Sequence, residues 1–271
     1  MPTIHPTALV DPKAELSDHV TVGPYAVIGP HVRIGRGTTV GPHAVIEGRT
    51  TIGAQCQIFA GAVVGAMSQD LKHTGQRSGL QIGGDNIIRE YTTISCGTEE
   101  GSITELGDGN LIMAYAHVAH DCRIGNRCVI ANAGTLAGHV IVEDQAVIGG
   151  LAAVHQFVRI GQLAIVGGCS KVVQDVVPFS LCDGHPARVC GMNVIGLRRA
   201  NVPAATRRAL HGAFKILFYS GLTASHAVAC LKSEAESSPE IQQLITFVRQ
   251  SKRGFCRAEA RGTSRTDYEQ V

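Results

Sequence analysis

The fold is decided by residues 112–161, IMAYAHVAHDCRIGNRCVIANAGTLAGHVIVEDQAVIGGLAAVHQFVRIG. An aliphatic residue returns at every sixth position of this stretch, and four histidines lie on the same repeat. The period matches neither the 3.6-residue spacing of an amphipathic helix nor the strict alternation of a half-buried strand. A fixed short repeat of this kind is typical of a solenoid.

The repeat extends far beyond this stretch. Stepping by six from Ile4 to Val172 gives 29 positions, and only Asp70, Gln76 and Glu100 are not Ile, Leu or Val. A small or β-branched residue follows four positions after each aliphatic one, as at Ala8, Ala14, Val20, Ala26, Val32, Thr38 and Ala44. One large and one small inward residue in every six predict an all-β parallel β-helix with three units per coil. At 18 residues per coil, the chain should form nine to ten coils.

The pattern also predicts the division of the chain. Residues 1–177 should form the β-helix, with 65–80, GAMSQDLKHTGQRSGL, as an extruded loop and Glu99–Glu105 as a tolerated corner insertion. Residues 178–202 should form an irregular bridge, and 203–253 a small α-helical C-terminal domain. Helices are expected over 204–220, 223–237 and 239–253, with Thr223 and Ser238 as N-caps and Pro239 at a first helical position. The polar residues 254–271 are expected to be disordered.

Composition excludes several classes of protein. The 24 basic and 22 acidic residues give a net charge of +2, too balanced to indicate nucleic-acid or membrane binding. The nine cysteines are scattered without a CxxC pair, so neither disulfides nor a zinc finger is expected. No basic head with a long apolar run begins the chain, and no integral membrane segment is present. These features favour a cytoplasmic enzyme or assembly.

The histidines can be placed by stacking, since residues 18 apart should lie one above another. His120 then stacks on Gly138 and Gln156, with His139 and His155 one residue away from that column. His120 should lie near a corner with its imidazole facing outward. A neutral imidazole is a competent general base, and a glycine N–H one coil away could stabilise an oxyanion.

The residues alone leave two alternatives open. The histidines could be polar surface residues of exposed turns on a purely structural β-helix. Alternatively, His117, His120 and His139 could bind zinc, as in the γ-carbonic anhydrases, which share the left-handed β-helix. The spacing of His117 and His120 need not converge on one ion, so no metal ligands are assigned.

A set of ordered motifs resembles one enzyme family. It comprises the hexapeptide repeat, QDLK at 69–72, IREYTTI at 88–94, AHVAHDC at 116–122, LAGHV at 136–140, VHQFVRIG at 154–161 and GMNVIGLRR at 191–199. Over residues 1–253 the chain resembles the acyl-ACP:UDP-N-acetylglucosamine O-acyltransferases, which begin lipid A synthesis. The resemblance implies a cytoplasmic homotrimer with a left-handed β-helix and active sites between subunits. It also implies transfer of an (R)-3-hydroxyacyl group from acyl carrier protein to the glucosamine 3-hydroxyl of UDP-N-acetylglucosamine, with no cofactor beyond the carrier's phosphopantetheine.

The same resemblance implies residue roles. His120 would be the general base, Asp121 would orient it, and the Gly138 amide would bind the oxyanion. Substrate-binding positions are Gln69, Asp70, Lys72, His117, His139, His155, Gln156, Asn193 and Arg199. Ile165 and Gly168 match positions that line the acyl groove, and the open Gly168 favours a long chain.

Two positions depart from the family pattern. Ile195 stands where many members have Glu, and Ala200 where a further Arg often follows.

Arg207, Arg208 and Lys215 could receive the acidic carrier protein. Another hexapeptide acyltransferase is the alternative within the pathway, but the N-acyltransferase carries an extra N-terminal domain, whereas the repeat here begins at Ile4. The 3-amino analogue of the sugar remains possible as acceptor.

Overall fold

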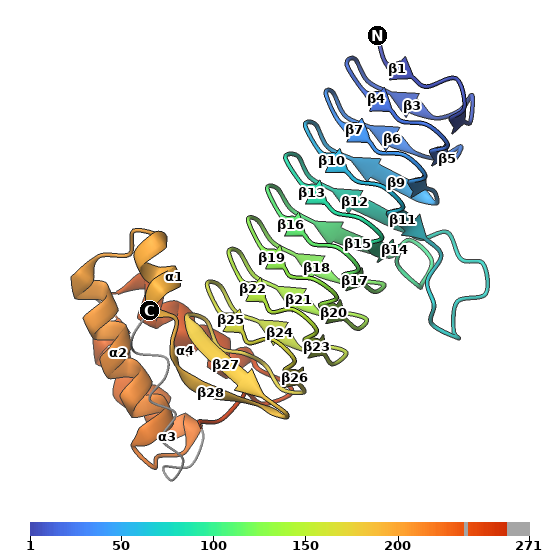
Figure 1. Cartoon of the computed structure of the whole chain (residues 1–271). Coiled ribbons are helices and arrows are strands. Elements are labelled where there is room, and N and C mark those ends of the chain that lie inside the picture. Colours follow the sequence, from blue (N-terminus) through green and yellow to red (C-terminus); the bar gives the residue numbers. More distant parts are fainter. Residues whose placement is uncertain (236–237, 259–271) are drawn as a thin grey trace.

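The computed structural model describes residues 1–235 and 238–258 of the chain. Short parallel strands wind into a three-sided prism, and a helical domain lies at its C-terminal end (Figure 1). The predicted parallel β-helix with a small helical domain is therefore confirmed. None of the helices in these ranges is both long and apolar enough to cross a bilayer.

The three faces of the prism are three sheets. The first face contains, in spatial order, β1 (Thr3–Ile4), β4 (Thr21–Val22), β7 (Thr39–Val40), β10 (Gln57–Ile58), β13 (Ile87–Ile88), β16 (Leu111–Ile112), β19 (Val129–Ile130), β22 (Val147–Ile148), β25 (Ile165–Val166), β27 (Ser180–Gly184) and β28 (Ala187–Met192). The second face contains β2 (Leu9–Val10), β5 (Val27–Ile28), β8 (Val45–Ile46), β11 (Val63–Ala66), β14 (Thr93–Ser95), β17 (His117–Val118), β20 (Thr135–Leu136), β23 (Ala153–Val154) and β26 (Lys171–Val172). The third face contains β24 (Arg159–Ile160), β21 (Ile141–Val142), β18 (Arg123–Ile124), β15 (Ile103–Leu106), β12 (Gly79–Ile82), β9 (Arg49–Ile52), β6 (Arg33–Ile34) and β3 (Glu15–Leu16).

From β4 onward, most six-residue units bury one large residue in the strand and one small residue just before it. Ile28 and Ile46 are at most 1% exposed, and the small residues Ala26 and Ala44 are completely buried. Equivalent residues stack in parallel register, for example Ile28 on Ile46. A closely stacked aliphatic column fills the narrow interior, which explains why the chain needs few aromatic residues.

The predicted nine to ten coils are confirmed. The first face contains ten parallel strands from β1 to β27, and the second face contains nine. The off-pattern positions Asp70, Gln76 and Glu100 lie in loops, while β27 and the bridge from Ile160 to Val176 continue the coil beyond β26.

Two segments leave the coil path. Residues 67–78 connect β11 to β12 and extend away from the prism (Figure 1). Residues 96–102 connect β14 to β15 as a shorter insertion. Both connections join the second face to the third face, and the strands that follow them return to register.

The prediction of an irregular bridge over 178–202 was wrong. Strand β27 continues the first face in parallel with β25, and β28 returns antiparallel to it. Helix α1 (Val194–Arg199) follows directly. The six-residue period stops here because Cys182 and Val189 are buried in the alternating pattern of a hairpin, which closes the open end of the prism.

The helical domain contains the three predicted helices, α2 (Ala204–Tyr219), α3 (Ala224–Ala235) and α4 (Pro239–Gln250). Ser238 Oγ accepts a hydrogen bond from the Ile241 N–H, so the predicted N-cap of α4 is confirmed. Thr223 Oγ1 accepts a hydrogen bond from the His226 N–H at 3.4 Å. Helix α4 ends at Gln250, three residues before the predicted limit of 253.

Arg159 joins this domain to the prism. Its Nε donates to Glu143 Oε1 at 2.7 Å, and its Nη1 donates to Gln250 Oε1 at 3.2 Å. The guanidinium also lies 4.5 Å from the ring centroid of Phe247 on α4. A partly buried ion pair with a cation–π contact fixes the helices on the third face.

The predicted disorder of 254–271 was wrong for its first residues. Phe255 forms a β-bridge with Asp175, and Ala258 forms one with Val189. Phe255 and Cys256 are buried, so this segment packs against the hairpin and the last coil. Residues 259–271 lie outside the described part of the chain.

Candidate active site

His120 lies at the corner between β17 and β18, where the chain turns from the second face to the third. The predicted outward orientation of its imidazole agrees with its contact to the extruded loop, but the residue is only 7% exposed. Asp70 from the extruded loop covers it, with Oδ2 3.6 Å from His120 Nε2. The His139 ring meets it edge-on, with centroids 5.1 Å apart.

Gly138 lies beside the His120 ring, as the 18-residue stacking predicted. The His139 N–H donates to the His120 carbonyl at 3.0 Å, which sets neighbouring coils in register at this corner. A Cβ on Gly138 would lie 2.4 Å from both Cε1 and Nε2 of His120. Only glycine therefore leaves room for the imidazole in this position. Within residues 1–235 and 238–258 no hydrogen bond uses the N–H of Gly138, which is a buried residue.

Asp121 holds the other nitrogen of the imidazole. Asp121 Oδ2 accepts a hydrogen bond from His120 Nδ1 at 2.8 Å. Adjacent residues can meet here because Asp121 occupies the left-handed region at φ 59°, which breaks the alternation of an extended strand. Burial alone would raise the pKa of Asp121, but hydrogen bonds from His120 and Ser102, the nearby His139 and the Thr98 N–H lower it. The carboxylate stays ionised and accepts from His120.

The extruded loop carries three candidate residues and brings Asp70 to this corner. Asp70 is half-buried, while Gln69 and Lys72 are exposed beside it. The Asp70 carboxylate accepts a hydrogen bond from the Lys72 N–H at 2.9 Å, which folds the loop back at this point. Of these three residues, Asp70 is the one in contact with His120.

His117 lies on β17 beside the same cluster. Its Nδ1 is 2.7 Å from Thr93 Oγ1 on the neighbouring strand. Burial lowers the pKa of His117 below its ordinary value of 6.5, and the nearby His120 lowers it further. His117 is therefore neutral at neutral pH and serves as a hydrogen-bonding group.

This depressed pKa predicts a pH-dependent stability. The unfolded chain takes up a proton near pH 6.5 that folded His117 resists, so the stability contribution is complete above that pH and is lost as the pH falls below it. His117→Asn should make the slope of the unfolding free energy against pH shallower, by up to about 1.4 kcal/mol per pH unit. Urea unfolding at several pH values measures this slope. The exposed His31→Asn is the control, and equal slopes in His117→Asn and wild type would contradict the prediction.

His139 is held in place by a residue that the sequence alone did not single out. Phe157 stacks on its ring with centroids 4.6 Å apart and planes 8° apart. His139 Nε2 also lies 3.8 Å from Asp121 Oδ2. Phe157 follows His139 by 18 residues, so stacking could have predicted this contact.

His155 and Gln156 extend the column by one coil. The His155 ring is hydrogen-bonded to the Gln156 carbonyl at 3.0 Å, and His155 is exposed. The aromatic contact of His139 is with Phe157, so the predicted convergence of His155 on His120 and His139 is not seen. These two residues can contribute only to the outer part of a site.

A cation could bind at this corner, but with a different ligand set from the three histidines that the sequence suggests. His120, Asp121 and His139 offer atoms that lie within 4.8 Å of one another. Asp121 takes the place expected for His117, whose Nδ1 is engaged with Thr93. The site has the donors for general-base chemistry and also for metal binding.

The remaining predicted residues lie elsewhere in the chain. Ile165 belongs to β25 on the first face, and Gly168 follows it at the corner leading to the second face. Asn193 caps α1, donating to the Leu163 carbonyl at 2.8 Å and accepting from the Gly196 N–H at 2.9 Å. Arg199 ends the same short helix and is exposed. One chain does not bring these four residues to His120.

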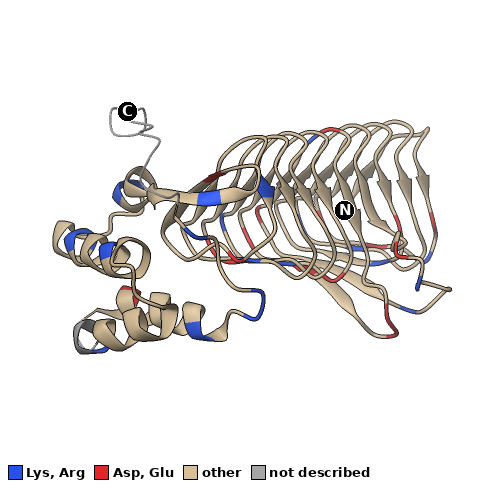
Figure 2. Cartoon of the chain, turned by 90° about the horizontal axis from the view of Figure 1, so that it is seen from below, with Lys and Arg blue, Asp and Glu red and all other residues tan. Residues whose placement is uncertain are grey.

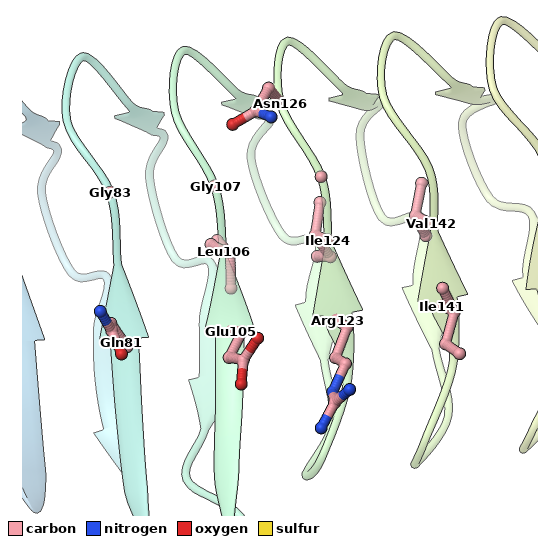
Figure 3. Close-up of a pocket in the computed structure, with 11 residues that line it drawn as sticks. Gln81, Gly83, Glu105, Leu106, Gly107, Arg123, Ile124, Asn126, Ile141 and Val142 are labelled. Carbon is pink, nitrogen blue, oxygen red and sulfur yellow. The ribbon is translucent and has the colours of Figure 1, made fainter.

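A groove on the third face is lined by residues that do not belong to the histidine cluster (Figure 3). Its exposed side chains include those of Gln81, Glu105, Arg123 and Ile141, which lie on four successive strands. None of the four belongs to the His120 cluster. The groove has a mixed polar and apolar surface and contains no nucleophile–base pair.

Comparisons with known proteins match the site and the fold. Residues 175–256 match the family model "Udp N-acetylglucosamine O-acyltransferase; Domain 2", and residues 13–48 and 103–138 match bacterial transferase hexapeptide repeats. An acyl-[acyl-carrier-protein]–UDP-N-acetylglucosamine O-acyltransferase of Alkalilimnicola ehrlichii is 54% identical over 258 residues, which cover 95% of this chain and 100% of that protein. This chain belongs to that acyltransferase family.

Further relatives and solved structures agree with this assignment. The enzyme of the same name from Thiobacillus denitrificans is 47% identical, over 95% of this chain and 100% of its own. The structure of LpxA from Acinetobacter baumannii has a TM-score of 0.90 at 41% identity, covering 94% of this chain and 99% of that one. The Francisella novicida UDP-N-acetylglucosamine acyltransferase has a TM-score of 0.91 at 33% identity, covering 94% of each chain. The prism is accordingly the left-handed β-helix of this family.

Proposed function

We propose that this acyltransferase moves an (R)-3-hydroxyacyl group from acyl carrier protein to the 3-hydroxyl of UDP-N-acetylglucosamine, with His120 as general base. This reaction is the first step of lipid A biosynthesis. The observation that carries the proposal is the buried His120, which lies between the Asp121 carboxylate and the backbone of Gly138. Family membership at 54% identity supports the substrates.

The geometry suggests how the proton moves. An ionised Asp121 can only accept, so its 2.8 Å bond places the proton of neutral His120 on Nδ1 and the lone pair on Nε2. Nε2 takes the proton of the sugar hydroxyl as its oxygen attacks the thioester carbonyl. The C–S bond then breaks, and the imidazolium returns the proton to the phosphopantetheine thiolate. The Asp121 carboxylate stabilises the imidazolium between these steps.

The Gly138 N–H is the proposed donor to the oxyanion. It lies beside the ring that activates the nucleophile, and no acceptor in the described ranges uses it. A fixed amide at this place needs no reorganisation when charge develops on the carbonyl oxygen. One corner would then supply both the base and the oxyanion donor.

Substrate contacts are proposed for the polar groups around this corner. Asp70 faces His120 Nε2 across 3.6 Å, so a sugar hydroxyl entering there would meet both groups. Gln69, Lys72, His117, His139 and Gln156 would complete the sugar and pantetheine contacts. His155, Asn193 and Arg199 would bind the nucleotide, with the Arg199 guanidinium suited to a diphosphate. Ile195 and Ala200 remove two polar groups from that part of the site.

A homotrimer is proposed because a single chain separates the residues of the site. His120 lies between the second and third faces, whereas Ile165 and Gly168 lie on and beside the first face. Packing the prisms side by side would bring different faces together and complete an acyl groove lined by Ile165 and Gly168. The open Gly168 would favour a long hydroxyacyl chain.

The helical domain is the proposed docking site for the acidic carrier protein. Arg208 and Lys215 are exposed on α2, and Arg207 is half-buried beside them. Figure 2 shows basic segments on several of these helices. All nine cysteines are free thiols, which supports a cytoplasmic location where the carrier protein is also found. We propose no cofactor other than the phosphopantetheine of the carrier and no nucleic-acid partner.

The proposal is tested with purified wild-type enzyme and (R)-3-hydroxyacyl carrier proteins of several chain lengths. UDP-N-acetylglucosamine and its 3-amino analogue are compared as acceptors, with and without a metal chelator. We expect transfer to the 3-hydroxyl that resists chelation and is fastest with a long donor. Transfer to the 3-amino sugar alone would correct the acceptor, and loss of transfer on chelation would overturn the metal-free mechanism. No transfer from any donor would overturn the proposed substrate pair.

A further inference from the structure

The short insertion over residues 96–102 has a role that the sequence did not suggest. It was expected to be a tolerated corner insertion, but it lies one coil from the corner that carries His120, because β14 before it pairs with β17 and β15 after it pairs with β18. The insertion also contacts the extruded loop over residues 67–78. It therefore touches both segments whose carboxylates face His120.

Thr98 is the residue of this insertion that contacts both segments. Its N–H donates to Asp121 Oδ2 at 3.2 Å, the same oxygen that accepts from His120. Its Oγ1 lies 2.6 Å from Ser68 Oγ in the extruded loop, so the two hydroxyl groups share a hydrogen bond. Thr98 is 4% exposed and Ser68 is 6% exposed. A hydroxyl pair buried in this way is costly to break, because water cannot replace the lost partner.

The Ser68 hydroxyl connects this contact to Asp70. The Asp70 N–H donates to Ser68 Oγ at 3.2 Å, which closes a tight turn between the two residues. The Asp70 carboxylate in turn lies with Oδ2 3.6 Å from His120 Nε2. A continuous series of contacts therefore runs from the Thr98 hydroxyl through Ser68 to the carboxylate that covers His120.

Further hydrogen bonds hold a later part of the loop on the insertion. The Thr98 carbonyl lies 3.0 Å from His73 Nδ1. The Glu100 carboxylate accepts a hydrogen bond from the Arg77 N–H at 2.8 Å. The loop is thus attached to the insertion both before and after Asp70.

We propose that Thr98 is a positioning residue for the sugar acceptor. Its hydroxyl, through Ser68, fixes the Asp70 carboxylate that covers the general base. This inference rests on the proposed function, in which Asp70 contacts the sugar. Without the Thr98 hydroxyl, Ser68 loses its partner in the insertion and the turn that presents Asp70 loosens. The Thr98 N–H still reaches Asp121, so His120 keeps its orientation and sugar binding should weaken more than proton transfer.

Steady-state kinetics of Thr98→Val, Ser68→Ala and Thr98→Ser test this role. Loss of one buried hydrogen bond should raise the KM for UDP-N-acetylglucosamine by about fivefold in Thr98→Val and in Ser68→Ala. The kcat and the KM for hydroxyacyl carrier protein should stay within about twofold of wild type. Thr98→Ser keeps the hydroxyl and should behave like wild type. An unchanged sugar KM in both Thr98→Val and Ser68→Ala would overturn the proposal.

Thr38→Val is the matched control for a general loss of stability. Thr38 is completely buried in an early coil, where its Oγ1 donates to the Gly53 carbonyl at 2.9 Å and accepts from the Cys56 N–H at 3.0 Å. Its replacement should lower the midpoint of thermal unfolding without changing either KM. A sugar KM raised equally in Thr38→Val and Thr98→Val would overturn the positioning role.

A double mutant and a crystal structure test whether Thr98 acts through Asp70. In an Asp70→Ala background no carboxylate remains to be positioned, so Thr98→Val should raise the sugar KM by less than about twofold. A full fivefold rise in that background would overturn the proposal. In a crystal structure of Thr98→Val, Asp70 Oδ2 should lie further from His120 Nε2 than 3.6 Å, and an unmoved carboxylate would also overturn it. A wild-type enzyme that transfers no acyl group would instead overturn the proposed function, while the crystal structure would still test the contact.

Discussion

Replacing His120 with alanine is expected to lower kcat for acyl transfer by about 10²–10⁴-fold, the usual contribution of a positioned general base. The imidazole is the only described group that combines a free nitrogen with the Asp121 and Gly138 contacts at this corner. The KM values should change little, because substrate binding is assigned to other residues. Steady-state transfer from hydroxyacyl carrier protein measures both constants.

His31→Ala is a suitable control for that experiment. His31 is an exposed histidine in the turn between β5 and β6, which lie several coils from β17 (Figure 1). The His31→Ala enzyme should transfer the acyl group at the wild-type rate and should unfold like wild type. A His120→Ala rate within tenfold of wild type would show that another group accepts the proton.

Adding one methyl group at Gly138 is expected to be nearly as damaging as removing the imidazole. The new Cβ would lie 2.4 Å from two ring atoms of His120, so the ring must move. A displacement of about 1 Å in a reacting group can cost about 100-fold in rate, and we expect kcat of Gly138→Ala to fall by at least that factor. The variant should remain folded, because the ring can swing outward towards Asp70.

Gly84→Ala is the matched control for this substitution. Gly84 also begins a corner turn, but its Cβ would meet nothing closer than the Ala54 carbonyl at 3.2 Å. Its activity should stay within about twofold of wild type while its stability falls slightly. A crystal structure of Gly138→Ala should show the displaced ring. An undisturbed ring with normal kcat would contradict the steric role of Gly138.

The regular parts of this protein could be predicted because their contacts repeat at a fixed sequence distance. Each coil places residue i on residue i+18, so the sequence spacing alone correctly predicted Gly138 beside His120. The same rule could have identified Phe157 beneath His139. Helices α2 to α4 were also predictable, since N-caps such as Ser238 act within three residues of chain.

The irregular parts escaped prediction for a physical reason. Residues 67–78 and 96–102 leave the coil, so the stacking rule no longer states what they touch. Their contacts are hydrogen bonds between two non-repeating segments, such as Ser68 with Thr98, and these have no sequence period. The hairpin of β27 and β28 was missed because its alternating pattern follows directly on a six-residue one.

The amino-acid sequence by itself determined the prism, its register and the meeting of His120 with Gly138, because a repeated unit has only one way to bury its aliphatic column. Tertiary structure alone decided that His120 is buried, that Asp121 turns towards it and that Asp70 faces its Nε2. Those positions depend on two insertions folding against one another, and no local or periodic preference specifies that contact. The fold also separates Ile165 and Gly168 from His120 within one chain, because they lie on and beside the first face, whereas His120 lies at the corner between the second and third faces.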